Sequence, residues 1–148
     1  MINHNIELVQ GTLKDLPFFR EILEMNSLPS EDIEGKEELL YKVYLDSNAV
    51  GLTGLEVHGN YGLLRSVVVN PERREKGVGS AIVEEMKAIA RTSGLTDLYL
   101  LTTTAPLFFE KTGFRRIARE EVPEAVLQAE EFKSICPASA VVMHFPLA

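Results

Sequence analysis

The sequence predicts a single α/β domain built on a mixed, mostly antiparallel sheet of six to seven strands with about four helices. Three observations support this fold class. The chain has 148 residues, which is a usual length for one domain. Its first half is rich in strand-like runs, and in its second half helical patterns alternate with short strands. This order is typical of α/β domains, so we expect residues 1–148 to form one domain.

Four strand-like runs occupy most of the first 70 residues: 6–12, 39–45, 50–58 and 61–70. Short polar turns at 46–48 and 59–60 separate the last three runs. Between the first and second runs, residues 13–26 carry apolar side chains at helical spacing. The first half therefore predicts one helix and four strands, the last two of which form a hairpin.

Four apolar residues recur every three or four positions in the second half: Val78, Ile82, Met86 and Ile89. This spacing predicts an amphipathic helix over 77–93, and Gly94 is a suitable residue to end it. The remaining predicted elements are a strand at 98–102, a helix at 105–111, a strand at 113–118, a helix at 124–133 and a strand at 140–145.

Composition argues against several classes of protein. Lys and Arg number 15 against 22 Asp and Glu, a net charge of −7, so we expect no affinity for nucleic acids or anionic membranes. The one cysteine, Cys136, cannot form an intrachain disulfide, and we expect a cytoplasmic protein. We expect neither a signal peptide nor a membrane span. Three scattered histidines and this cysteine offer no metal-ligand spacing, so no metal is expected.

The segment from residue 67 to residue 80 predicts a binding site for a phosphate or diphosphate. A strand leads through a turn with three basic residues into the start of a helix. The first amides of a helix have no intrahelical acceptor, and the helix dipole makes this end positive. Gly77 and Gly79 remove the side chains that would keep an anion from these amides. The alternative is a glycine-containing turn with solvated arginines.

Two motifs in this half resemble the GNAT superfamily of N-acetyltransferases. Arg74, Gly77 and Gly79 match the pattern R/Q-x-x-G-x-G/A that follows a strand in that family. Residues 108–114, F-F-E-K-T-G-F, stand where the family usually has L-Y-E-K-x-G-F. The resemblance covers residues 52–114 and implies acetyl-CoA as cosubstrate, with a neutral amine attacking the thioester directly.

The resemblance also implies where acetyl-CoA would bind. A strand over 64–69 would splay from a strand over 98–102, with the pantetheine arm in the gap and the diphosphate at the helix N-terminus. The residues that it assigns to the cosubstrate are Val67, Val68, Val69, Arg74, Glu75, Lys76, Gly77, Val78, Gly79, Ser80, Phe108 and Phe109.

Two positions depart from the usual GNAT pattern. Phe109 replaces the tyrosine that commonly acts as general acid, and Thr102 replaces an asparagine. Because a phenylalanine cannot protonate a thiolate, another hydroxyl (Thr102, Thr103, Thr104 or Tyr99) or water would do so, or the step needs no acid. Thr102 and Thr103 are the catalytic candidates among these hydroxyls.

A narrower resemblance concerns the acceptor. Residues 100–114, L-L-T-T-T-A-P-L-F-F-E-K-T-G-F, and the tail 131–140, E-F-K-S-I-C-P-A-S-A, resemble amino-acid acetyltransferases of the N-acetylglutamate synthase type. Together with 54–56 (G-L-E) and 63–67 (L-L-R-S-V), the tail also resembles the small N-acetyltransferases found with arsenic-resistance genes. We interpret Cys136 as a small buried residue that lines the acceptor pocket.

Two opposite charges in the predicted hairpin are candidates for holding such an acceptor. If 59–60 form a two-residue turn, Glu56 and Arg65 lie diagonally on one face, within side-chain reach. Arg65 would bind the substrate carboxylate, and Glu56 would attract the ammonium or accept its proton. The alternative is a plain cross-strand ion pair. His58 shares this face and is an alternative base, although its place beside the turn favours exposure, and we expect His144 to face solvent.

The sequence therefore predicts a cytoplasmic, acetyl-CoA-dependent N-acetyltransferase for a small amino acid or similar amine. A polyamine, an aminoglycoside or a protein N-terminus is the alternative acceptor. A non-catalytic acyl-CoA sensor is the alternative function, because Phe109 replaces the usual acid. The expected partner is a small molecule, and an exposed final strand at 140–145 offers a surface for a homodimer.

Overall fold

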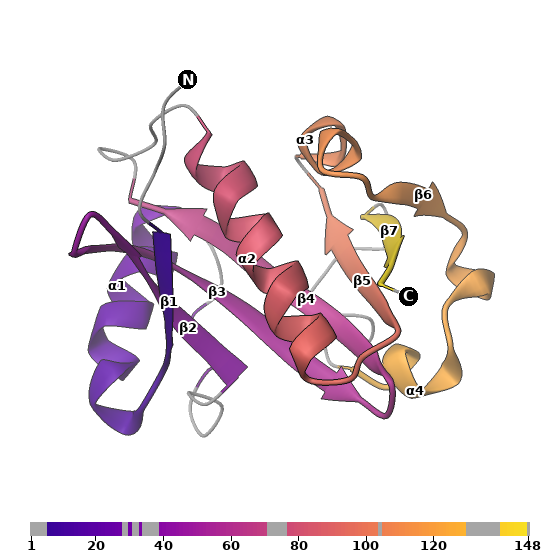
Figure 1. Cartoon of the computed structure of the whole chain (residues 1–148), viewed down its shortest axis with the longest axis horizontal. Coiled ribbons are helices and arrows are strands. Elements are labelled where there is room, and N and C mark those ends of the chain that lie inside the picture. The colour runs from indigo at the N-terminus through magenta and orange to yellow at the C-terminus, as the bar shows by residue number, and fades with distance from the viewer. Residues whose placement is uncertain are drawn as a thin grey trace. The chain divides into compact units, whose positions relative to one another are not determined.

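The computed structural model describes residues 6–27, 30, 33, 39–70, 77–103, 105–129 and 140–147. Within these residues the strands are β1 (Ile6–Gln10), β2 (Leu40–Leu45), β3 (Asn48–His58), β4 (Tyr61–Val69), β5 (Asp97–Thr102), β6 (Arg115–Ile117) and β7 (Val141–Pro146) (Figure 1). The α-helices are α1 (Leu16–Met25), α2 (Val78–Thr92), α3 (Pro106–Lys111) and α4 (Glu124–Leu127). Apart from α1 and α4, these bounds lie within two residues of the predicted ones.

The seven strands of the described residues form one sheet in the order β1-β2-β3-β4-β5-β7-β6. The pairs β1–β2, β2–β3, β5–β7 and β6–β7 are antiparallel, whereas β4 and β5 are parallel. The recorded pairing of β4 with β5 joins Tyr61–Leu63 to Asp97–Tyr99, at the N-terminal end of both strands. The sheet confirms the predicted mixed, mostly antiparallel α/β fold.

Contacts divide the chain into two compact units. One comprises Met1–Leu55 and Ser66–Glu85, and the other comprises Glu56–Arg65 and Met86–Ala148. β3, β4 and α2 each continue from one unit into the other. That residues 1–148 fold as one domain stays a prediction.

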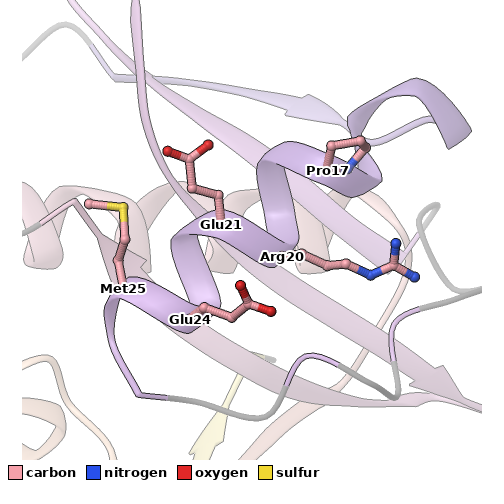
Figure 2. A pocket seen from close by; sticks show the side chains of 5 residues that line it. All are labelled: Pro17, Arg20, Glu21, Glu24 and Met25. Carbon is pink, nitrogen blue, oxygen red and sulfur yellow. The ribbon is translucent and has the colours of Figure 1, made fainter.

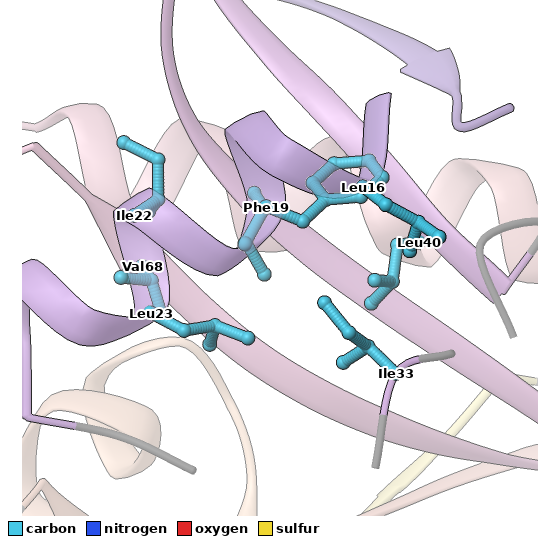
Figure 3. Packing of buried hydrophobic residues seen from close by; sticks show 8 residues of the cluster. Leu16, Phe19, Ile22, Leu23, Ile33, Leu40 and Val68 are labelled. Carbon is cyan, nitrogen blue, oxygen red and sulfur yellow. The ribbon is translucent and has the colours of Figure 1, made fainter. Parts of the chain in front are cut away.

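Helix α1 supplies half of the core of the first unit. Its apolar side chains follow the predicted helical spacing and are at most 7% exposed; they are Leu16, Phe19, Ile22 and Leu23. They gather with Ile33, Leu40, Leu52 and Val68 (Figure 3). Full burial of each such side chain contributes roughly 1.5–3 kcal/mol, so this cluster fixes β3 and β4 against α1.

The predicted helix over 13–26 is two elements rather than one. Leu13–Asp15 form a 3-10 turn, and the α-helix begins at Leu16. Pro17 has no N–H to donate to Leu13 four residues earlier, so a continuous α-helix would lack a hydrogen bond there. The Asp15 carboxylate accepts the N–H of Thr12 (2.9 Å) and closes the turn instead.

The second unit has its own apolar core beneath β4, β5 and β7. Its buried members are Leu63, Tyr99, Val122, Val126, Ala129 and Val142. Helix α4 ends at Leu127. Of the helix predicted over 124–133, residues 130–133 lie outside the described residues. No helix of the described chain combines the length and the apolar character needed to cross a membrane.

The final strand is not exposed as predicted. β7 lies between β5 and β6, so neither of its edges is open to a second chain. His144 on β7 is also not solvent-facing: its side chain is 14% exposed, and its Nε2 lies 2.7 Å from Oδ1 of Asp97. The ring of Tyr99, its register partner on β5, packs 4.9 Å from the His144 ring.

We predict that Asp97→Asn lowers stability in a pH-dependent way. Burial by itself raises the pKa of Asp97, but hydrogen bonds from His144 and Thr96 and the charge of His144 hold this pKa below its ordinary value. A carboxylate with a lowered pKa stabilises the fold above its unfolded-state pKa and loses this contribution as pH falls through the folded-state pKa. Urea unfolding should show a loss of roughly 1–2 kcal/mol at neutral pH.

The difference between wild type and Asp97→Asn should then close as pH falls through the lowered folded-state pKa of the Asp97 carboxyl group. Asp46→Asn, in the exposed turn between β2 and β3, is the control and should cost less than about 0.5 kcal/mol. A cost for Asp97→Asn that stays constant from neutral to acid pH would contradict the assignment.

Candidate functional site

The N-terminus of α2 carries residues predicted to bind a diphosphate. Gly77 precedes the helix with a φ of 86°, a conformation that suits glycine because it has no Cβ. Its carbonyl accepts the N–H of Ala81 (3.0 Å). Val78 is buried, whereas Gly77 and Ser80 are exposed, and the first turn carries no acidic residue. The first amides of α2 have no acceptor within the helix, so this end fits an anion.

The C-terminal half of β4 carries the predicted backbone contacts. The side chains of Val68 and Val69 are buried, and Val67 is half-buried. Asn70, the next residue, donates its N–H to the carbonyl of Val50 (2.6 Å), which keeps this end of the strand on β3. Because the side chains at 68 and 69 are committed to the interior, a ligand at this strand would meet backbone groups.

Helix α3 carries Phe108 and Phe109, both half-buried. Their rings meet edge to face at 5.0 Å, and the Phe109 ring meets that of Phe114 at 5.9 Å. The neighbouring Leu107 is 67% exposed. A packed hydrocarbon ring therefore stands at position 109, where the GNAT pattern usually has an acidic hydroxyl.

A buried lysine holds the C-terminal end of α3. Lys87 on α2 is 4% exposed, and its Nζ donates to the carbonyl of Thr112, the residue that follows α3. The same ammonium lies 3.9 Å from the centroid of the Phe145 ring. Positive charge is favoured at a helix C-terminus and over an aromatic face. Lys87 thus fixes the end of the helix that carries Phe109.

Lys87 was not among the predicted site residues, although the sequence carries a signal for it. Val83, Lys87 and Ala90 recur at spacings of four and three along α2, and all three are buried. A charge in line with buried apolar residues indicates a specific buried partner. The spacing does not identify that partner, the carbonyl of Thr112, which lies 25 residues away in the chain.

Thr102, one of the two threonines predicted as catalytic candidates, lies at the end of β5 and is 8% exposed. Its Oγ1 accepts the N–H of Ala105 (3.0 Å) and so shapes the turn into α3. A hydroxyl that accepts in this way keeps its own proton to donate. Thr103, the other candidate, is exposed, and Thr104 lies outside the described residues.

Glu56 and Arg65 form the predicted pair on the β3–β4 hairpin. Oε2 of Glu56 lies 3.4 Å from Nη1 of Arg65, and the two side chains are 14% and 9% exposed. This geometry confirms that the two residues reach each other across the hairpin. Two charges with so little exposure to water are costly to separate. A surface ion pair, by contrast, contributes little.

His58 completes this group, and the expectation that it would be exposed is wrong. Its side chain is 22% exposed, and its Nε2 lies 3.6 Å from Oε1 of Glu56. That nitrogen is buried. The cause is the alternation of side chains along β3, which places His58 and Glu56 on one face. The hairpin thus brings one carboxylate between an imidazole and a guanidinium.

A separate hollow lies on the outer side of α1, lined by Pro17, Arg20, Glu21, Glu24 and Met25 (Figure 2). None of these residues was predicted to bind acetyl-CoA or the acceptor. Arg74, Glu75 and Lys76 of the predicted phosphate turn, and Cys136 of the predicted acceptor pocket, lie outside the described residues. Among the described residues, no three His, Cys, Asp or Glu side chains gather as a metal site.

Residues 36–116 match the family model described as an acetyltransferase (GNAT) domain, which is more than half of the chain. The chain belongs to the GNAT acetyltransferase family. A stretch of 64 residues is 38% identical to an amino-acid acetyltransferase of Pseudomonas fluorescens and covers 43% of this chain. The match spans only 15% of that GNAT relative's own length.

Solved structures agree with the GNAT fold. The N-acetylglutamate synthase of Neisseria gonorrhoeae, complexed with coenzyme A and N-acetyl-glutamate, superposes with a TM-score of 0.81 at 18% identity over 99% of this chain and 36% of its own. The Rv2747 protein of Mycobacterium tuberculosis, complexed with CoA, gives a TM-score of 0.78 at 20% identity over 96% and 99% of the two chains. At these identities the likeness shows the fold alone.

We predict that Gly77→Glu abolishes CoA binding and that Gly77→Gln weakens it much less. Both variants place a side chain on a residue with positive φ, so both carry the same backbone strain of roughly 1 kcal/mol. Only glutamate adds a negative charge at the positive end of α2. Calorimetric titration should separate the two dissociation constants by about tenfold or more, and equal constants would contradict a diphosphate site at this helix end.

Proposed function

We propose that the protein is a cytoplasmic, acetyl-CoA-dependent N-acetyltransferase whose acceptor is a small amino acid or an amino-acid-like amine. Membership in the GNAT family supports acetyl-CoA as the acetyl donor. The observation that carries the acceptor class is the pair of opposite, shielded charges on the β3–β4 hairpin, Glu56 and Arg65, 3.4 Å apart. The name of the Pseudomonas fluorescens relative points to the same acceptor class.

An α-amino acid matches this charge pair group for group. Its carboxylate would bind the Arg65 guanidinium through two hydrogen bonds, and its ammonium would lie against Glu56. Separating a shielded ion pair is costly unless each charge finds a new partner. A zwitterion supplies both partners at once. A simple amine pairs with Glu56 but gives Arg65 no carboxylate in place of Glu56.

The chain's residues then have three chemical tasks. Acetyl-CoA supplies an activated thioester carbonyl and a thiolate leaving group. Glu56 removes one proton from the ammonium, because only the neutral amine has a lone pair for attack. His58, 3.6 Å from Glu56, is placed to pass that proton onward. Arg65 holds the substrate carboxylate so that the amine meets the carbonyl in a fixed geometry.

The remaining step is protonation of the leaving thiolate. Phe109 has no proton to give, and the Thr102 hydroxyl is the group we favour, because its oxygen already accepts the Ala105 N–H. Tyr99 is less suited by position, because its ring packs between those of Tyr61 and His144. Burial, then the charge of Asp97 and the proximity of Tyr61, raise the pKa of its phenol, but a phenol is still a stronger acid than an alcohol, so acidity does not decide between the two.

A non-catalytic acyl-CoA sensor is the second candidate, and the packed ring of Phe109 favours it. Release of free thiol from acetyl-CoA separates the two functions. We would mix the protein with acetyl-CoA and the twenty amino acids, with arsenic- and phosphorus-containing analogues, and with polyamine and aminoglycoside controls. An acetyltransferase releases thiol with at least one acceptor. A protein that binds CoA in calorimetry but releases none with the whole panel would refute the proposal.

We predict that Arg65→Ala raises the KM for an accepted amino acid by about tenfold or more, the cost of one charge-assisted, two-bonded contact. The comparison substrate is the same compound without its α-carboxylate, and its KM should change far less. Arg116→Ala is the matched control, because Arg116 is half exposed in a surface ion pair with Glu110 that contributes little. Equal changes in KM for the two substrates would exclude a carboxylate contact.

A further inference from the structure

One nitrogen of His58, at the end of β3, is buried at a cost. Its Nε2 atom is shielded from water and forms no hydrogen bond with any residue that the structure describes. The acidic group beside it is Glu56, whose Oε1 lies 3.6 Å away, beyond the usual length of a hydrogen bond. A buried polar atom without a hydrogen bond lowers stability, so packing alone does not account for this placement.

The carboxylate of Glu56 is held loosely from two sides. Its Oε1 faces the His58 imidazole at 3.6 Å, and its Oε2 faces the Arg65 guanidinium at 3.4 Å. Charge-assisted hydrogen bonds between such groups are about 2.7–2.9 Å long, so both contacts are longer than a full bond. A carboxylate held in this way can exchange a partner for a ligand without first breaking a short hydrogen bond.

Titratable and charged groups on this side of the sheet come from three described strands. β3 contributes Glu56, and β4 contributes Arg65 together with Tyr61, which follows His58 directly after the two-residue turn. On β5, Asp97 is the register partner of Tyr61, and its carboxylate is paired with a histidine of β7. Carboxylates, tyrosine and arginine keep their usual charge between about pH 5.5 and about pH 7.5. Histidine is the kind of side chain whose charge changes over that range.

We infer that His58 is a positioning residue that makes binding of the acceptor amine depend on pH. When uncharged, its imidazole leaves the Glu56 carboxylate to the ammonium of the acceptor. When protonated, it forms an ion pair with Glu56 and competes with that ammonium for one negative charge. The inference rests on the proposed function, since it needs an amino acid at Glu56 and Arg65. It concerns binding, before any proton passes from Glu56 to His58 in the reaction.

Binding of the acceptor and protonation of His58 then oppose each other. When an acceptor binds in mildly acid solution, the protonated imidazole loses one proton to solvent and the ammonium takes its place beside Glu56. By linkage, acid must weaken acceptor binding by the same factor by which the acceptor weakens protonation. An α-amino acid keeps both of its charges over this pH range, so the change in affinity comes from the protein.

His58→Gln tests the inference. The measurement is the Kd of the best amino-acid acceptor from the thiol-release panel, taken by calorimetry on protein saturated with CoA, which has no acetyl group to transfer. For wild type we expect this Kd to rise by roughly fivefold or more from about pH 7.5 to about pH 5.5. Glutamine has an N–H donor but cannot become charged. The Kd of His58→Gln should therefore match wild type at the higher pH and change by less than about twofold at the lower one.

His144→Gln is the matched control, because His144 is also paired with a carboxylate, that of Asp97, but on β7 rather than on the hairpin. This variant should keep the wild-type rise in Kd. The inference is overturned if the Kd of wild type stays constant or falls at acid pH, or if His58→Gln keeps the full rise. If wild type releases thiol with no member of the panel, the proposed function itself fails, and the inference fails with it.

Counting protons decides the case where His58→Gln does not fold. The heat of acceptor binding to the CoA complex of wild type is measured in two buffers that differ in ionisation enthalpy, and the difference gives the number of protons exchanged. We expect release of up to about one proton at about pH 6 and almost none at about pH 7.5. Proton uptake, or no exchange at the lower pH, would overturn the inference and leave the proposed function standing.

Discussion

Pairing of β3 with β4 is the constraint on which the candidate sites depend. Two neighbouring strands in one register bring Glu56 to Arg65 at 3.4 Å, on the face that also carries His58. Strand register is set by backbone hydrogen bonds, and a slip of one residue would turn every side chain to the other face. The hairpin therefore decides which charges meet and on which face of the sheet they lie.

The shielded charges described in the second unit have specific partners. Lys87 lies at the carbonyl end of α3 and over the Phe145 ring, and Asp97 lies against His144. The Glu56–Arg65 pair differs in chemistry, because an amino acid could replace each partner with its own opposite charge. Desolvation makes an unpaired buried charge expensive, so under the proposed function this pair would favour ligands that carry both charges.

Much of the fold was predictable because the local patterns are strong. The apolar spacing from Val78 to Ile89 predicted α2 to within a residue at each end, and the two-residue turn at Gly59 predicted the hairpin that holds Glu56 and Arg65. The expectations for His58 and His144 were wrong for a shared reason. Distance from a turn or from the chain end says little about exposure once a neighbouring strand or carboxylate covers the ring.

By itself, the sequence determined the class of fold and the family, and it predicts a diphosphate site at the start of α2. These depend on residues close together in the chain, where period, glycine and charge act directly on local backbone structure. Only the tertiary structure decided that β7 lies inside the sheet, that Lys87 reaches Thr112 and that His144 pairs with Asp97. Such contacts join residues far apart in sequence, and they follow from packing and strand order, which no local pattern records.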